Sequence, residues 1–232
     1  MGKDTILGEN IIVIYSSSDA KGKRDATGAF IPEAKAFAKH HCVPKENMLG
    51  VPCTKLKASD RREKVFSFLE AKDSGSVELI AWFGHGWSSG IQFGINKKNV
   101  DELLYALDDS GRPNLKHVLY ACSTASTNEN TRKVSSPGTD GGFADTLRDH
   151  MWDSGYNGGW VDAHLQPGHT TRNPYIMRFI CNEEYHSRGG GNWLVKPKST
   201  YWATWRNAIQ NTTFRYNFPV LDFLTLDELP IK

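Results

Sequence analysis

Continuous apolar segments recur along this chain, and segments with helical periodicity lie between them. The clearest apolar segment is residues 10–18, NIIVIYSSS, and residues 78–83 and 116–122 have the same character. An unbroken run of β-branched and aromatic residues is typical of a strand that is buried on both faces. Because strands that alternate with helices form parallel sheets, the sequence predicts an α/β protein, a three-layer α/β/α sandwich with a mostly parallel central sheet.

The remaining segments complete this alternation. Helices are expected over 30–41, from a cap at Ser59, over 99–107 and over 142–151, and further strands over 47–54 and 158–164. No repeat or linker separates a second domain, and 232 residues are enough for one large core. A single domain over 1–232 is expected, with 123–142 as an exposed loop and 165–232 as a less regular part that completes the sheet and pocket.

Composition and charge exclude several classes of partner. Hydrophobic residues make up 39% of the chain, and the net charge of +2 comes without a basic stripe, so no nucleic acid is expected. No apolar run reaches the roughly 18 residues that span a bilayer, and the first residues lack the apolar region of a signal peptide. No membrane partner is expected, and the expected location is the cytoplasm. Four scattered cysteines indicate free thiols.

Two of the apolar strands end in residues suited to catalysis. One runs into His85 as IAWFGHG, and the other runs into Cys122 as HVLYACS. Carboxyl ends of neighbouring parallel strands meet at one edge of a sheet, about 5 Å apart, so imidazole and thiol should face one cleft. A nearby imidazolium lowers the pKa of a thiol and raises the fraction of nucleophilic thiolate. The amides of Gly86 and Cys122 would then bind the oxyanion of an acyl-transfer intermediate.

These two motifs resemble the signature of the caspase-like cysteine peptidases, which include caspases, metacaspases, legumains, gingipains and clostripain-like enzymes. The resemblance covers roughly residues 11–164, including the order of strands and helices. It implies a cysteine endopeptidase of caspase-like fold that acts on protein or peptide substrates, with His85 and Cys122 as its dyad. Cys122 follows His85 by 37 residues, fewer than the roughly 50 of true caspases, so the chain is similar to a divergent member.

The pocket for the residue before the cleaved bond does not carry over from the family. Tyr120 stands two residues before the cysteine, where the family often has Gln, Asp or Glu. Asp162, at the end of the strand over 158–164, would favour Arg or Lys, because basic-specific members tend to place an acid there. Arg24, in the loop after the first strand, would instead favour an acidic residue, as a caspase arginine does. We expect a preference for Arg or Lys, with these three residues as candidates for substrate binding.

Two other functions stay open at this level. The segment from Gly86 to Gly90 spells G-x-S-x-G, and Ser88 with Asp162 and His186 would form a serine hydrolase triad in chain order. A nucleophile elbow needs a helix directly after the serine, and the alternating segment that follows opposes this hypothesis. Inactive relatives use the caspase-like fold as an interaction module, and the tryptophans near the C-terminus would suit a regulatory protein partner.

No cofactor or metal is expected. The His and Cys residues at 40–42, 53, 164 and 169 are of ligand type but lack a paired C-x-x-C or H-x-x-x-H spacing. Some members of the family require calcium, but no acidic loop in this chain has a recognisable ligand spacing.

Self-cleavage in the loop over 123–142 is a prediction of the resemblance, because many family members are activated by a cut between the dyad segment and the rest. Arg132 and Lys133 lie in its middle and would match an enzyme specific for basic residues. Purified protein is expected to yield two fragments separated near Lys133, as read by mass spectrometry. Fully active protein that stays intact at this position would contradict the prediction.

Overall fold

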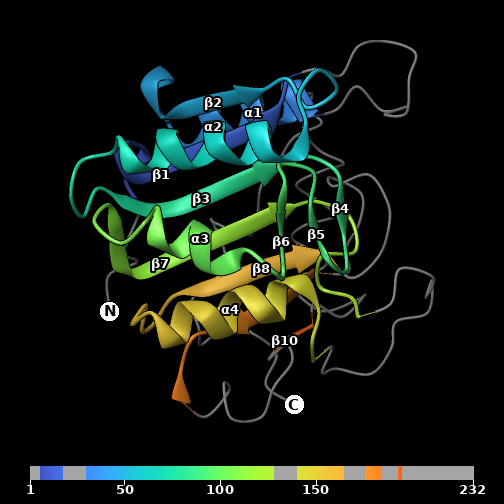
Figure 1. Cartoon of the computed structure of the whole chain (residues 1–232). Helices are drawn as coiled ribbons and strands as arrows, with labels where there is room; N and C mark the ends of the chain where they lie inside the picture. The colour runs from blue at the N-terminus through green and yellow to red at the C-terminus, as the bar shows by residue number, and fades with distance from the viewer. Residues whose placement is uncertain (1–5, 18–29, 128–139, 165–175, 184–192, 195–232) are drawn as a thin grey trace, which may run out of the picture.

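One mixed sheet organises the described part of the chain. The computed structural model describes residues 6–17, 30–127, 140–164, 176–183 and 193–194. The strands of the sheet are β1 (Ile11–Ser16), β2 (Met48–Val51), β3 (Val77–Phe83), β7 (Gly111–Tyr120), β8 (Trp160–His164), β9 (Ile176–Ile180) and β10 (Trp193–Leu194). They lie in the order β10-β9-β8-β7-β3-β1-β2 (Figure 1). The strands β8, β7, β3, β1 and β2 run parallel to one another. Strand β9 is antiparallel to β8, and β10 is antiparallel to β9. The prediction of an α/β protein with a mostly parallel sheet is confirmed.

Helices cover both faces of this sheet. They are α1 (Phe30–His40), α2 (Ala58–Glu70), α3 (Val100–Tyr105) and α4 (Phe143–Asp153), with short 3-10 helices at Gly8–Asn10 and Lys45–Asn47. In Figure 1, α2, α3 and α4 lie in front of the sheet and α1 lies behind it. One apolar cluster, which includes Trp82, lies on the α2–α4 side, and a second, which includes Phe83, lies on the α1 side. Within the described residues, none of the helices combines the length and apolar character needed to cross a membrane.

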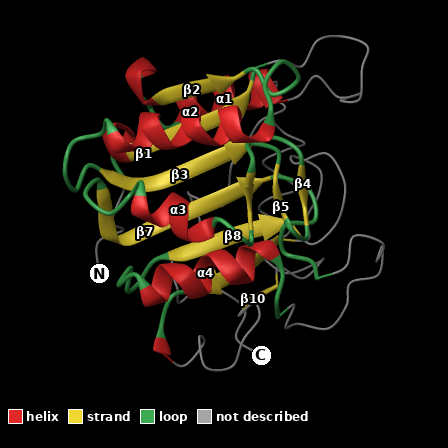
Figure 2. Ribbon diagram, viewed as in Figure 1, coloured by secondary structure: helices red, strands yellow, loops and turns green. Residues whose placement is uncertain are grey.

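A small antiparallel sheet follows β3 at the carboxyl edge of the main sheet (Figure 2). We call it the edge sheet; its strands are β4 (Gly86–Trp87), β5 (Gly90–Ile91) and β6 (Ile95–Asn96). Phe93, between β5 and β6, packs against Trp82 with ring centroids 5.7 Å apart. Gly94 follows with φ of 84°, and a Cβ at this position would collide with the Ala58 carbonyl oxygen at the start of α2. The edge sheet is thereby anchored on the α2 side of the molecule.

Two local expectations were wrong. Ser59 does not cap α2, because Lys57 is the N-cap residue and the Ser59 hydroxyl hydrogen-bonds Asp60 Oδ1 at 2.9 Å. The strand over 116–122 begins earlier, at Gly111, and ends at Tyr120, so the cysteine that follows lies in a turn beyond the strand.

Two histidines are buried within the layers of the fold. His117 is 0% exposed, and its Nδ1 accepts a hydrogen bond from Trp82 Nε1 at 3.1 Å. Burial lowers the pKa of His117 to about 3, and it lowers the pKa of His164, at the end of β8, to about 4. Both imidazoles are therefore neutral in the folded protein near neutral pH.

The neutral state of His117 predicts a loss of stability in mild acid. The unfolded imidazole takes up a proton near pH 6.5 and the folded one does not, so stability is full above pH 6.5 and falls as the pH drops towards about 3. Between pH 7 and pH 5, His117 should remove about 2 kcal/mol from the free energy of unfolding. The His117→Gln variant keeps an acceptor for Trp82. Its free energy of unfolding, measured by urea denaturation, should fall by about 2 kcal/mol less between pH 7 and pH 5 than that of the unchanged protein. Equal pH dependence in the two proteins would contradict the prediction.

Candidate active site

The parallel pairing of β3 with β7 sets His85 and Cys122 at the same level. Phe83 pairs with Tyr120 in the register of the two strands, and the Gly84 amide donates to the Tyr120 carbonyl at 3.4 Å. His85 and Cys122 each follow this pair by two residues. Since neighbouring strands lie about 4.8 Å apart, the two residues leave the sheet side by side at its carboxyl edge.

The site lies on the face of the sheet that α1 covers. Phe83 and Tyr120 belong to the apolar cluster on that face, and their rings stack with centroids 4.6 Å apart. His85 lies edge-to-face against Phe30, the first residue of α1, with ring centroids 5.1 Å apart. His85 and Cys122 are both half-buried. Both residues therefore keep partial contact with solvent, and His85 lies at the point where α1 begins.

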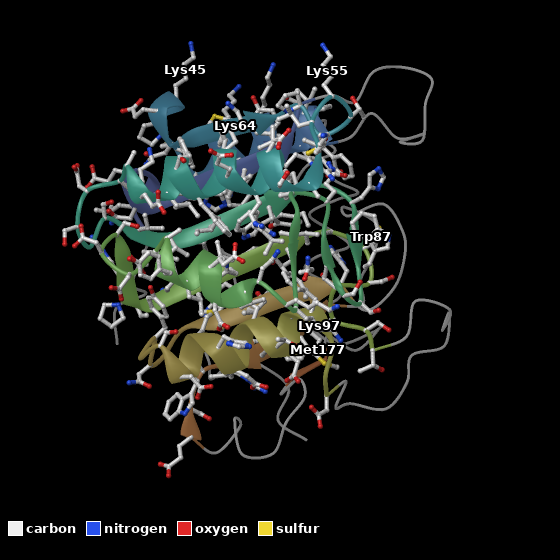
Figure 3. The ribbon with its side chains drawn as sticks, in the orientation of Figure 1. Lys45, Lys55, Lys64, Trp87, Lys97 and Met177 are labelled. Carbon is white, nitrogen blue, oxygen red and sulfur yellow. The ribbon has the colours of Figure 1, made fainter. Side chains whose placement is uncertain are left out.

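Gly86 brings the histidine segment into contact with the turn that carries Cys122. A Cβ on Gly86 would lie 2.6 Å from Thr124 Cγ2 and 2.8 Å from both the Ala121 Cβ and the Cys122 carbonyl oxygen. Only glycine permits this approach. Figure 3 shows the next residue, Trp87, at the edge of the molecule where β3 and β7 end, and its side chain is 42% exposed.

The turn after Cys122 is compact and held by several hydrogen bonds. Ser123 has a φ of 56°, in the left-handed region that non-glycine residues seldom adopt, and this conformation turns the chain sharply. The Thr124 hydroxyl donates to the Ala121 carbonyl at 3.1 Å, and the Ala125 amide donates to the His164 carbonyl at 3.0 Å. Residues 123–126 are at most 6% exposed, so the expectation of an exposed loop was wrong for its first residues.

The backbone amide of Gly86 points away from the neighbouring strand of the edge sheet. The Gln92 amide donates to the His85 carbonyl at 3.0 Å, which makes these two residues a hydrogen-bonded pair of the antiparallel ladder. Gly86 and Ile91 form the next pair. Because hydrogen-bonded and non-hydrogen-bonded pairs alternate, the Gly86 N–H points away from β5. It is directed to the open edge of the edge sheet, where a substrate oxygen would approach.

Asp162 lies deeper in the fold than the sequence suggested. It lies in the middle of β8 and pairs with Val118, two residues before the end of β7. Its placement at a strand end was therefore wrong. Arg178 binds both carboxylate oxygens, from Nε at 2.7 Å and Nη2 at 2.6 Å, and lies 3.7 Å above the Trp160 ring. Burial raises the pKa of Asp162, and the Arg178 guanidinium opposes that rise.

Tyr120 is a core residue beneath the site. It is 1% exposed, stacks on Phe83 and meets Phe37 of α1 with ring centroids 5.9 Å apart. Its burial in the core contradicts the expectation that it binds substrate. Four other candidates, Arg24, Arg132, Lys133 and His186, lie outside the described residues.

Ser88 occupies a hairpin turn. Trp87 pairs with Gly90, so Ser88 and Ser89 form the two-residue link between β4 and β5. The serine is 9% exposed, and a strand follows it in place of a helix. This geometry lacks the strand–turn–helix of a nucleophile elbow, so it does not support the serine hydrolase hypothesis.

Gln92 is a site residue that the sequence did not indicate. Its Oε1 accepts a hydrogen bond from the His85 amide at 2.9 Å, in addition to the bond between Gln92 N and His85 O. A glutamine in an alternating segment carries no sequence signal for such a contact.

Two comparisons with known proteins were negative. No protein-family model matches the sequence, and no curated protein matches it. Among the described residues, no group of three or more His, Cys, Asp or Glu side chains is arranged to hold a metal ion.

Replacing Gly86 with alanine should separate the two halves of the site. The new methyl group would overlap Thr124 Cγ2 and the Cys122 carbonyl oxygen, so one segment must shift. We expect the alkylation of Cys122 by iodoacetamide at pH 6 to slow roughly tenfold, with a stability loss of roughly 1–3 kcal/mol. Adding Thr124→Ser removes the nearest methyl and should recover part of both losses. An unchanged alkylation rate in Gly86→Ala would rule out this contact as the cause of dyad alignment.

Proposed function

We propose that this protein is a cysteine endopeptidase of the caspase-like type, in which His85 and Cys122 form the catalytic dyad. The observation that carries the proposal is the common level of the two residues beyond the paired strands β3 and β7, with Gly86 packed on the Cys122 turn. A thiol and an imidazole that leave the sheet side by side, both half-buried, suit nucleophilic attack on a carbonyl.

Peptide hydrolysis would proceed through an acyl-enzyme. The Cys122 thiol passes its proton to the His85 imidazole, and the thiolate attacks the carbonyl carbon of the scissile bond. The Gly86 and Cys122 amides bind the oxyanion, which collapses as His85 donates the proton to the leaving amine. Water, deprotonated by the same imidazole, then hydrolyses the thioester and restores the thiol.

The order of layers supports the caspase-like type of fold. The apolar clusters on the two faces, with α1 on one side and α2–α4 on the other, are those of a three-layer α/β/α sandwich. The two motifs that resemble the family fall on β3 and β7. Fold and motif therefore favour the same pair of residues.

A preference for Arg or Lys before the cleaved bond belongs to the proposal, with Asp162 as the candidate acid. Arg178 already binds both oxygens of this carboxylate, so a substrate cation would have to compete with a buried guanidinium. If Asp162 sets the preference, Asp162→Asn selectively lowers cleavage after Arg and Lys. If its role is structural, the variant loses stability without a change in the residue before the cut.

The proposal predicts peptide cleavage that depends on Cys122. The protein and its Cys122→Ala and Cys42→Ala variants would be incubated with a complex peptide mixture under reducing conditions, with and without calcium. Every new terminus would be read by mass spectrometry. Cuts should fall at least 1,000-fold in Cys122→Ala, because the nucleophile is lost, and persist in Cys42→Ala, which removes an exposed thiol at the other end of α1.

Three outcomes would lead elsewhere. Cuts that persist in Cys122→Ala but vanish in Ser88→Ala would assign the reaction to the serine. Cuts that survive both substitutions would come from a contaminant. The absence of cuts in every sample would sink the peptidase proposal in favour of the inactive interaction module.

A further inference from the structure

We infer that Gln92 is the positioning residue of this site: it binds both backbone groups of His85 and so holds the imidazole at the level of Cys122. This inference rests on the proposed function of the dyad. It also makes a structural claim about the His85 backbone that is measurable in the absence of any substrate.

One residue satisfies the amide and the carbonyl of His85. The Gln92 N–H donates to the His85 carbonyl at 3.0 Å, and Gln92 Oε1 accepts from the His85 N–H at 2.9 Å. In a regular hydrogen-bonded pair of antiparallel strands, both bonds join backbone to backbone. Here the side-chain amide replaces the backbone carbonyl of Gln92 as the acceptor. A substitution at Gln92 therefore removes one of the two hydrogen bonds of the pair. In a regular ladder both bonds belong to the backbone, and a substitution would leave them in place.

The side chain of Gln92 is itself held in place. It is 7% exposed, and its Cδ lies 3.2 Å from the position that a Cβ on Gly84 would occupy. It also lies close to the buried Cys53 thiol, as does Ser16 at the end of β1. We call the two hydrogen bonds between Gln92 and the His85 backbone the clamp. The clamp connects the histidine segment to side chains at the ends of neighbouring strands.

The sequence around His85 makes such a clamp necessary. Gly84 and Gly86 flank the histidine, and glycine leaves the backbone with more conformations than any other residue. The last ladder bond of β3 is the long one from the Gly84 amide at 3.4 Å. The hydrogen bonds to Gln92 therefore restrict the backbone conformation at His85, which the flanking glycines leave unrestricted. A misplacement of about 1 Å between reacting groups is enough to cost up to 100-fold in rate.

The experiment compares two variants of Gln92 with a matched control. Gln92→Met keeps the length of the side chain and removes the acceptor, whereas Gln92→Glu keeps an acceptor oxygen. Asn99→Leu is the control, since Asn99 is another buried amide that bonds backbone groups next to the edge sheet, at Asn96 N and Gly94 O. It loses comparable hydrogen bonds without touching His85.

Three readouts would be taken on each protein. The first is hydrogen exchange of the His85 amide, which needs no substrate. The second is the pH dependence of Cys122 alkylation by iodoacetamide, with His85→Ala as reference and sites assigned by mass spectrometry. The third is kcat and KM on a cleaved peptide. Thermal unfolding of every variant measures the purely structural cost.

In Gln92→Met we expect the His85 amide to exchange at least tenfold faster and the alkylation profile to move to that of His85→Ala. We expect kcat to fall roughly 10- to 100-fold with KM within about twofold. Gln92→Glu should retain amide protection, and Asn99→Leu should leave all three readouts within about twofold at a similar loss of thermal stability.

If Gln92→Met behaves as Asn99→Leu does, the inference is wrong even if the protein cleaves peptides. If His85 exchange and Cys122 alkylation respond as expected but no peptide is cleaved, the clamp stands and the peptidase proposal fails.

Discussion

The parallel register of β3 and β7 is the constraint on which the site depends. Every residue of β3 is buried, so neither strand can slip by one position without moving apolar side chains from one cluster to the other. Phe83 stacked on Tyr120 fixes the register on the α1 face, and Trp82 bonded to His117 fixes it on the opposite face. The residues that follow each strand inherit this register. The proximity of the two dyad candidates is therefore a consequence of core packing.

Two buried ion pairs, one in the sheet and one in α4, contribute to stability and lie away from the dyad residues. Asp162 and Arg178 neutralise one another between β8 and β9, where loss of either partner would leave a buried charge costing about 3–5 kcal/mol. Arg148 of α4 is also fully buried and binds Asp145 at 2.7 Å. Burial raises the pKa of Asp145 to about 6, the reverse of what an exposed ion pair would produce. The first pair joins β9 to β8, whereas the second lies within α4.

The parts of the fold that the sequence predicted are those with long, continuous patterns. The runs that became β1 and β3 are apolar enough to identify strands buried on both faces, and α1 and α4 lie within one or two residues of their expected bounds. The edge sheet was not predicted, because two-residue strands are too short to show a period of two. Asp162 was misplaced although the end of its strand at His164 was predicted correctly, because it lies two residues before that end, in the middle of β8. Gln92 was missed because its role depends on a side chain that replaces a backbone acceptor.

The edge sheet connects the two faces of the molecule at the point where chemistry is proposed. Its apolar side chains Ile91, Phe93 and Ile95 belong to the cluster on the α2–α4 side, whereas His85 contacts Phe30 on the α1 side. The histidine segment is thus anchored by a core that lies across the sheet from the imidazole itself. The residues on either side of His85 can therefore be glycines, which permit close approach to the Cys122 turn. Packing of the edge sheet restricts the conformations that glycine itself leaves open. A tight contact at Gly86 and a hydrogen-bonded clamp at Gln92 are the two local requirements that follow from it.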